Sequence, residues 1–363
     1  MKIFLKLVFI IFVLTGCVQT KYSVQQYDPI KNNSSSSIIN TKQESGFFNS
    51  LKGKDTSISI AIVFPSHTIG KYALEATNSI NTYLLDKNQK FDLKVYDIVV
   101  QNKNNLIDAV EKIKDDNITK VIAMITKEDL KYLNNIRGIE SIKFYLPLVN
   151  KNDITNKNEI NRLDVTFGAI SYVAQFEKLI EYAKDRPIVE FYGNSGIGRT
   201  LHDYLKDKKI TYTKKIDDNN GRYKNFLEEN KKLDNSAVIL NTPIVKSSIL
   251  LSAINAQELM ISTIMSTQLN YTPLLFSLTQ KQDREKLIVA NSIGKIPQEL
   301  EEYNHLIGNN LSYSWVNYST IIGVEYLLNN NIEMFDDLRI QDKQVIFPVN
   351  LYKVGRYSFS MIN

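Results

Sequence analysis

Short apolar runs alternate with amphipathic stretches along most of this chain. Ser57–Phe64 is largely apolar and is closed by Pro65, which predicts a strand buried on both faces. In the stretch that follows, 69–86, Ala76, Ile80 and Leu84 recur at helical spacing. The same alternation predicts strands at 91–99, 120–125 and 143–149, and helices at 103–114 and 128–136.

The pattern restarts after about residue 165. Residues 161–170 are predicted to be an extended crossover, and 171–184 a helix. Arg186–Ile216 then reads as strand, glycine turn, helix and strand, which is a βαβ unit and therefore favours a parallel sheet. Further elements are expected as helices near 223–232 and 247–259 and as strands at 237–240 and 272–278.

This order predicts an α/β fold of two doubly wound parallel-sheet lobes joined by hinge crossovers. The crossovers are expected near residues 161–170, 284–294 and 329–340. The first lobe is expected to comprise residues 55–165 plus 286–330, and the second 166–285 plus 331–363. The expected ranges ahead of the lobes are 1–16 for a signal peptide and 17–54 for a polar, disordered tether.

The amino-terminal residues indicate the cellular location of the protein rather than its fold. Lys2 and Lys6 precede an apolar run, 7–14, that is too short to span a bilayer, so the segment predicts a secretory signal. Leu14-Thr15-Gly16-Cys17 resembles a bacterial lipobox, and the resemblance implies cleavage before Cys17 and acylation of that residue by fatty acids such as palmitate. Cys17 is the single cysteine, so no intramolecular disulfide is possible. The alternative is a plain secretory signal with a chance cysteine.

The implied location is the periplasmic side of a Gram-negative envelope membrane. Val18 follows the cysteine, and under the sorting rule of enteric bacteria a residue other than aspartate favours the outer membrane. The 363-residue chain is 43% hydrophobic and 23% charged, which is ordinary globular composition. Of its 44 lysines and arginines, 42 remain without Lys2 and Lys6, against 39 acidic residues, so general nucleic-acid binding is not expected.

Four segments resemble the type 1 periplasmic-binding-protein fold of leucine/isoleucine/valine-binding proteins. Ile60–Ser66 is similar to the first strand and its Pro-hydroxyl loop, and Tyr192–Arg199 to the turn that opens the second lobe. Ser314–Leu328 is similar to a late first-lobe helix, and Gln344–Tyr352 to the terminal strand. With the lipobox, the chain resembles the lipoproteins that activate penicillin-binding peptidoglycan synthases, although the long helical-repeat amino-terminal domain of the best-known members is not expected here.

The glycine turn also fits a second template. Gly193, Gly198, Arg199 and Thr200 match the phosphate loop with arginine in the lysine position. Arginine does not replace the compact ammonium at the phosphates, and a lipoprotein would meet little nucleotide. The favoured interpretation is that the glycines let the backbone turn tightly from strand into helix.

The resemblance implies ligand contacts in the cleft after the first and third strands. Ser66, His67 and Thr68 precede a predicted helix and suit a carboxylate, although simple helix capping by Ser66 or Thr68 is favoured. In Thr126-Lys127-Glu128-Asp129 only Thr126 fits the family pattern. Tyr192 and Asn194 complete the candidate cleft residues.

Other chemistry has little support in the sequence. The three histidines, His67, His202 and His305, show no metal-ligand spacing, and no G-x-S-x-G motif is present. His202 is expected on a helix surface. Trp315, with Tyr313 and Tyr318, is expected in the core rather than as a partner-binding anchor. Neither a cofactor, a metal nor an enzymatic activity is therefore expected.

Two functions remain. The preferred hypothesis is a non-enzymatic, lipid-anchored regulator or scaffold that binds another envelope protein, most plausibly a peptidoglycan synthase and less so a secretion or motility complex. The alternative is a tethered periplasmic receptor for an amino acid or similar small solute. The match on only one wall of the cleft and the permanent anchor favour the first.

Overall fold

The computed structural model describes residues 39–41, 57–88, 90–216, 223, 227 and 230–362. The predicted signal peptide, Cys17 and nearly all of the predicted tether lie outside these residues, as does much of the helix expected near 223–232. Within the tether range, Ile39–Thr41 forms strand β1 and pairs antiparallel with Leu93–Val95 at a sheet edge, so these three residues differ from the expectation of disorder. All of the described residues belong to one compact unit.

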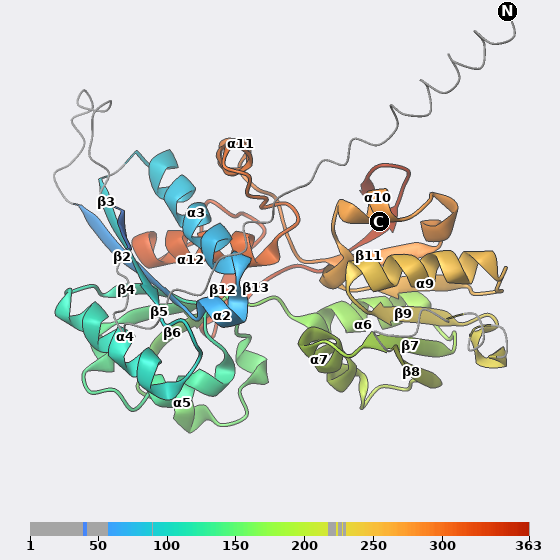
Figure 1. The fold of residues 1–363 in the computed structure, drawn as a ribbon, viewed down its shortest axis with the longest axis horizontal. Helices are drawn as coiled ribbons and strands as arrows, with labels where there is room; N and C mark the ends of the chain where they lie inside the picture. The colour runs from blue at the N-terminus through green and yellow to red at the C-terminus, as the bar shows by residue number, and fades with distance from the viewer. Residues whose placement is uncertain are drawn as a thin grey trace, which may run out of the picture. The chain divides into compact units, whose positions relative to one another are not determined.

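The first sheet has the order β1-β3-β2-β4-β5-β6-β13-β12 (Figure 1). Its central strands are parallel, β12 is antiparallel to β13, and β13 is parallel to β6. The strand bounds are β2 (Ile58–Phe64), β3 (Phe91–Asp97), β4 (Lys120–Ala123), β5 (Lys143–Leu146), β6 (Asp164–Phe167), β12 (Arg339–Gln341) and β13 (Gln344–Ile346).

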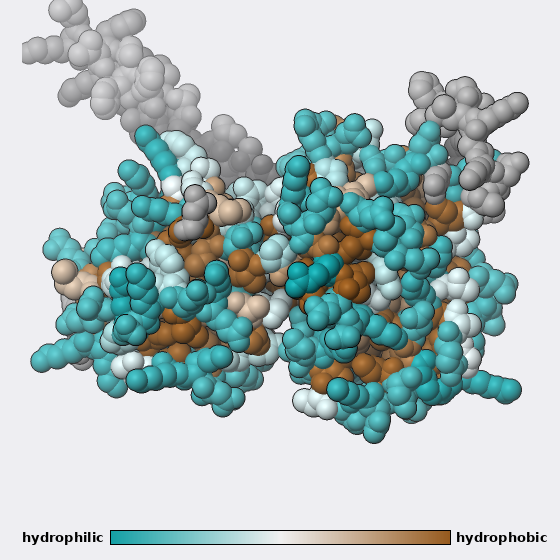
Figure 2. Space-filling view, turned by 180° about the vertical axis from the view of Figure 1, so that it is seen from behind, coloured by the Kyte–Doolittle hydropathy of each residue, from teal (hydrophilic) through white to brown (hydrophobic). Residues whose placement is uncertain are grey.

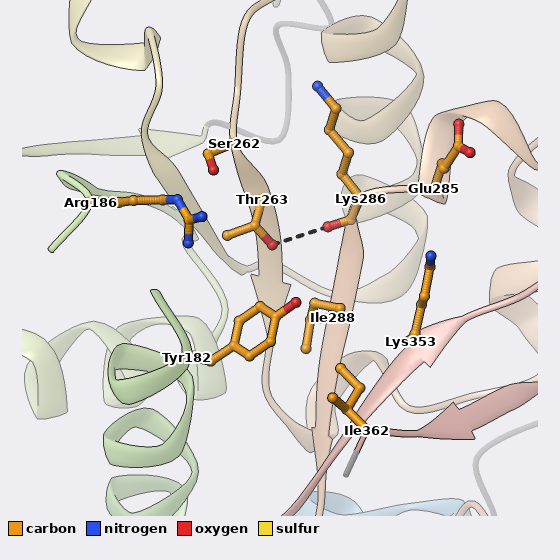
Figure 3. Close-up of a pocket in the computed structure, with 9 residues that line it drawn as sticks. All are labelled: Tyr182, Arg186, Ser262, Thr263, Glu285, Lys286, Ile288, Lys353 and Ile362. Carbon is orange, nitrogen blue, oxygen red and sulfur yellow. Dashed lines mark hydrogen bonds between the residues drawn. The ribbon is translucent and has the colours of Figure 1, made fainter. Parts of the chain in front are cut away.

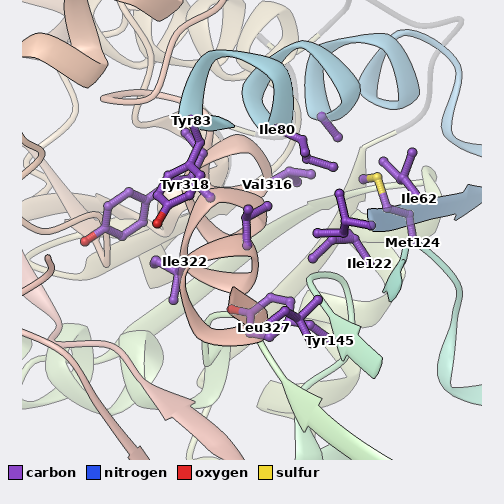
Figure 4. Packing of buried hydrophobic residues seen from close by; sticks show 14 of the residues in the cluster. Ile62, Ile80, Tyr83, Ile122, Met124, Tyr145, Val316, Tyr318, Ile322 and Leu327 are labelled. Carbon is purple, nitrogen blue, oxygen red and sulfur yellow. The ribbon is translucent and has the colours of Figure 1, made fainter. Parts of the chain in front are cut away.

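Alternate residues of β2 enter two different cores. Ile60 and Ile62 pack with helices α3 (Lys71–Asp86) and α12 (Trp315–Asn329), as Figure 4 shows for Ile62. Ala61 and Val63 pack on the other face with α4 (Lys103–Asp115) and α5 (Leu130–Leu133). Because both faces are covered, the strands need apolar residues throughout, which is the pattern read from the sequence.

The second sheet has the order β15-β14-β11-β10-β9-β7-β8. Strands β7 to β11 are parallel, and β14 and β15 are added antiparallel. The bounds are β7 (Ile188–Gly193), β8 (Tyr212–Ile216), β9 (Ala237–Asn241), β10 (Thr263–Ser266), β11 (Leu287–Asn291), β14 (Asn350–Val354) and β15 (Phe359–Met361). Helices α6 (Tyr172–Ala183) and α7 (Gly196–Leu205) cover one face, and α9 (Ile244–Ala256) and α10 (Leu274–Leu278) the other. The predicted fold class, two α/β lobes with mainly parallel sheets, is confirmed.

Three segments pass between the sheets: residues 168–171 after β6, 292–297 after β11 and 347–349 after β13. The second is followed by α11 (Gln298–Leu306), which packs on α3. The first two lie close to the predicted crossovers, whereas the third lies beyond the expected 329–340.

Strand pairing also assigns the returning segments differently from the expected lobe ranges. Strand β6 continues to Phe167 in the first sheet, β11 belongs to the second sheet, and β12 and β13 belong to the first. The segment 344–352, expected as one strand, is two strands in different sheets. Pro348 lies between them, and proline lacks the N–H that a continuous ladder would need. The sequence pattern predicted strand in this segment but could not predict which sheet each part would join.

The strand predicted at 272–278 is also wrong, because Leu274–Leu278 is helix α10. Short apolar runs do not distinguish a strand from a short buried helix. Pro273 stands at the amino-terminal boundary of this helix, a position that proline tolerates because its missing N–H is not needed there.

Candidate functional site

The candidate residues follow three strands at their carboxyl ends, which is where ligands bind in open α/β sheets. Ser66, His67 and Thr68 form most of the short helix α2 (Ser66–Ile69) after β2. Thr126 follows β4, and Tyr192 and Asn194 lie at the end of β7 in the second lobe. Among the described residues, no hydrogen bond joins the first-lobe candidates to Tyr192 or Asn194.

The backbone N–H groups expected to hold a carboxylate are occupied by the protein itself. The Ser66 N–H donates to the Asp97 carboxylate at 3.1 Å, and the His67 N–H donates to the Val99 carbonyl at 2.9 Å. The Thr68 N–H donates to the Pro65 carbonyl. Asp97 therefore takes the place at this turn that a ligand carboxylate would need.

The capping interpretation of Ser66 and Thr68 is wrong. Pro65 occupies the cap position of α2, Gly70 occupies that of α3, and neither helix has a side-chain cap. The loop that supplies the Val99 carbonyl holds Val99 at a φ of 57°, a left-handed conformation that is unusual for a β-branched residue. Backbone strain of this kind costs about 1–3 kcal/mol and persists where the surroundings over-determine it.

Thr126 is bonded within the first lobe. Its hydroxyl donates to the Asp129 carboxylate at 3.1 Å and accepts from the Gln101 side-chain amide at 2.8 Å. Its backbone N–H also donates to Asp129, which is 4% exposed. Because both the hydroxyl proton and the N–H are engaged, Thr126 serves this loop rather than presenting two donors to a solute.

The turn after β7 is held by its own side chains. The Ser195 hydroxyl accepts from the Gly198 N–H at 3.2 Å, which caps α7, and the Arg199 guanidinium donates back to the Asn194 carbonyl. A Cβ at Gly198 would lie 2.5 Å from the Gly193 carbonyl oxygen, so a glycine is required for the close approach of helix and strand. Arg199 therefore closes the turn, which supports the structural interpretation over a phosphate loop.

A polar cluster beside this turn was missed from the sequence. Glu190, fully buried in β7, accepts from the Asn241 amide at 2.9 Å and lies 2.8 Å from Nδ1 of His202. Tyr192 stacks on the His202 ring with the centroids 4.0 Å apart. His202 thus faces the sheet rather than the helix surface, contrary to expectation. The charged Glu190 inside the run Ile188–Tyr192 was the available signal.

The carboxyl ends of β9 and β10 carry buried polar atoms that lack a hydrogen-bond partner among the described residues. The residues concerned are 5% exposed or less, and the atoms are Asn241 Oδ1, Thr267 Oγ1, Gln268 Nε2 and Asn270 Oδ1. Buried polar groups nearly always have a partner, so each such atom calls for a water or a ligand. No sequence motif marks them, because all four are common uncharged residues.

Side chains of the two sheets also meet directly. The Tyr204 hydroxyl of α7 donates to Asp153, which follows β5, at 2.8 Å. Burial raises the pKa of the Tyr172 hydroxyl, and a hydrogen bond from the Trp315 indole opposes that shift. Trp315 is half-buried and packs against the first-lobe core, and Tyr318 is 1% exposed, in agreement with the expected core placement.

The described residues include no helix that combines the length and the apolar composition needed to cross a bilayer. They also contain no group of three or more histidine, cysteine, aspartate or glutamate side chains placed to hold a metal ion.

Comparison with known proteins gives structural matches only. No protein-family model and no curated protein matches the sequence. A putative branched-chain amino acid ABC transporter from Rhodospirillum rubrum is 11% identical, with a TM-score of 0.62 over 85% of this chain and 100% of that chain. The Thermus thermophilus branched-chain amino acid ABC transporter with bound valine is 12% identical, with a TM-score of 0.59 over 85% and 96%.

The substrate-binding protein LivJ from Streptococcus pneumoniae, in complex with isoleucine, is 6% identical, with a TM-score of 0.58 over 85% of this chain and 99% of that chain. These likenesses show that the chain has the type 1 periplasmic-binding-protein fold, as the sequence resemblance predicted. At such low identity these matches support the fold of this chain but do not identify its ligand.

Proposed function

We propose that this protein is a non-enzymatic receptor that holds a small polar solute at the carboxyl ends of its strands, on the periplasmic side of a Gram-negative envelope membrane. The observation that carries the proposal is the structural match over 85% of this chain and at least 96% of three branched-chain amino acid transport proteins, two of which hold isoleucine or valine. The comparisons therefore support the tethered-receptor alternative better than the preferred scaffold hypothesis.

The polar groups of the site favour a solute whose contacts differ from those of a free amino acid. The N–H groups at Ser66 and His67 already hold Asp97 and Val99, so a ligand carboxylate there would have to displace a charged group of the protein. The unpartnered atoms of the second lobe offer amide oxygens, an amide N–H and a hydroxyl instead. These are uncharged donors and acceptors, which suit a neutral solute rich in hydroxyl or amide groups.

A second candidate is the partner-binding regulator, with a peptidoglycan synthase as the partner. The specific observation in its favour is that the first-lobe candidates are satisfied without a solute and that Tyr204 and Asp153 join the two lobes directly. Two lobes joined by such contacts can present a protein-binding surface without first binding and releasing a solute. In either case we propose that Cys17 carries the lipid anchor, with the outer membrane as the favoured location.

The two functions separate in one experiment on protein refolded to remove any carried-over ligand. Melting temperatures are measured against sugars, peptides, wall fragments and amino acids, beside a crosslinking pull-down from cells probed for the peptidoglycan synthases. A receptor gives stabilisation by one solute that grows with concentration, by about 2.7 kcal/mol at a hundredfold excess over Kd.

Thr267→Val is the matched variant because it keeps the side-chain shape and removes only the hydroxyl. For a solute that uses this hydroxyl, we expect the ligand-dependent shift to fall while the solute-free protein is at least as stable, since an unpartnered buried hydroxyl costs about 1–3 kcal/mol. No stabilisation by any solute, together with specific crosslinking to a synthase, would favour the regulator. Stabilisation by a free amino acid that is lost in Ser66→Ala/Thr68→Ala would show that the first-lobe turn binds its carboxylate after all.

A further inference from the structure

The second lobe has a pocket at the end of its sheet opposite the carboxyl ends of the parallel strands. Thr263 begins β10, Lys286 directly precedes β11, and Arg186 lies between α6 and β7. Lys353 joins them because β14 runs antiparallel and pairs with β11 at Ile288. The cavity measures about 280 Å³, near the lower end of the roughly 300–1,000 Å³ range of small-molecule sites.

The pocket is positively charged. Arg186, Lys286 and Lys353 line it with a single carboxylate, Glu285. The Lys286 ammonium donates a hydrogen bond to the Ile261 carbonyl at 2.8 Å. Arg186 donates one of its guanidinium N–H groups to the Ala183 carbonyl at 3.3 Å. A guanidinium has five N–H donors in a planar fork, so Arg186 keeps donors for a carboxylate. Neither Arg186 nor Lys353 has an acidic partner within ion-pair distance in the described part of the chain.

The surface between these charges is apolar and aromatic. In Figure 3 the Tyr182 ring lies beside Thr263 and Ile288, on the same side as Arg186, while Glu285 and Lys353 lie across the pocket. The Thr263 hydroxyl donates to the Lys286 carbonyl at 3.3 Å, so it faces the strand rather than the open space. Ile288 is 4% exposed and belongs to the core behind the pocket.

From this arrangement we propose that the pocket is a second ligand site, for a small organic carboxylate with a flat or apolar body. The carboxylate pairs with the Arg186 fork, the body lies against Tyr182 and Ile288, and Lys353 adds long-range attraction at the opposite wall. An arginine stacks and pairs with planar anions better than a lysine does, which is why the negative end is assigned to Arg186.

This site goes beyond the proposed receptor function and is independent of it. All of its lining residues belong to the second lobe, and none is among the polar residues at the carboxyl ends of β9 and β10. Occupancy of the pocket therefore does not require a solute at the other end of the sheet, and failure of one proposal leaves the other standing.

The test is a fluorine NMR titration of 4-fluorobenzoate with the purified full chain at low ionic strength. Saturable line broadening is expected with 4-fluorobenzoate and not with the uncharged 4-fluorobenzamide. Arg186→Gln should weaken binding at least about tenfold, because a charge-assisted hydrogen-bonded contact is lost. Lys353→Gln should weaken it less, by about twofold to threefold, as a more distant charge.

Lys281→Gln is the control, since it removes the same charge from an exposed position outside the pocket. It should bind as the unmodified protein does, and so should Thr267→Val. Equal affinity in Arg186→Gln and Lys281→Gln would overturn the proposal, as would equal binding of the amide and the acid. Absence of saturable binding at a probe concentration on the order of 10 mM would also overturn it.

Discussion

A single tyrosine shows how closely side chains decide the packing of the first lobe. Tyr145 of β5 is fully buried between Gly168, in the first crossover, and Gly323 of α12. A Cβ at Gly323 would lie 2.2 Å from the Tyr145 ring, and one at Gly168 would lie 2.3 Å from its hydroxyl oxygen. The hydroxyl is 3.2 Å from Ser319 Oγ, which in turn donates to the Gly168 carbonyl at 2.7 Å. Figure 4 shows Tyr145 lying next to α12 in this core.

We therefore expect Gly323→Ala to destabilise the protein by about 1–3 kcal/mol through overpacking. This sign is opposite to helix propensity, which favours alanine by about 1 kcal/mol. Urea denaturation followed by circular dichroism measures the difference. Gly196→Ala in the first turn of α7 is the control, because its Cβ would meet nothing within 4 Å. Stability of Gly323→Ala equal to that of the control would show that the ring has room to move.

At the scale of elements, one buried arginine ties the last hairpin to the rest of the second lobe. Arg284, 3% exposed, donates to the carbonyls of Gly355 at 3.3 Å and Arg356 at 2.7 Å, in the turn between β14 and β15. It also donates to the carbonyl of Thr279. Burial lowers the pKa of its guanidinium, but the group stays charged throughout the physiological range. The hairpin that ends the described chain is therefore anchored by polar contacts as well as by packing.

Arg284→Met keeps an unbranched apolar stem and removes every donor. We expect it to lower the free energy of unfolding by about 3 kcal/mol, because the carbonyls of Thr279, Gly355 and Arg356 lose a charged donor. A hydrogen bond to a charged group contributes about 1.5–3 kcal/mol, and less where the carbonyl is partly exposed. Arg356→Met, at an exposed neighbouring arginine, should cost less than about 1 kcal/mol. Proteolysis near residues 355–358 in the first variant only would locate the loosened element. Equal stability of the two variants would mean that the guanidinium contributes nothing to the anchoring.

For the molecule as a whole, the fold of the two lobes and the membrane attachment of the amino-terminal segment rest on different evidence. The lobes follow from the sheets and from the structural comparisons. The side of the molecule shown in Figure 2 is largely hydrophilic, with brown apolar areas between the polar side chains. Membrane attachment thus rests on the lipobox-like sequence before Val18, which lies outside the described residues.

Cys17→Ala tests this attachment in cells. Without the thiol the chain cannot be diacylated, so it should move to the soluble periplasmic fraction or accumulate as an unprocessed precursor. Several acyl chains anchor a protein firmly, so we expect nearly all of the unmodified protein in the membrane fraction. Val18→Ala is the control and should leave fractionation unchanged. Normal processing and membrane partitioning of Cys17→Ala would contradict lipidation.

The fold class could be predicted from the sequence alone, because short apolar runs that alternate with amphipathic helical stretches form a recurring pattern along the chain. Segments such as Ile58–Phe64 and Lys103–Asp115 could therefore be recognised one at a time. Trp315–Asn329, which is buried on nearly every side, was expected only from the resemblance. The sheet that each of 344–346 and 350–354 joins could not be predicted in this way, since a short strand pairs according to its neighbours in space. The tertiary structure also brings the Asp97 carboxylate, thirty-one residues away, into a hydrogen bond with the Ser66 N–H. Hydrogen-bond partners of that kind are set by three-dimensional proximity, which local sequence does not encode.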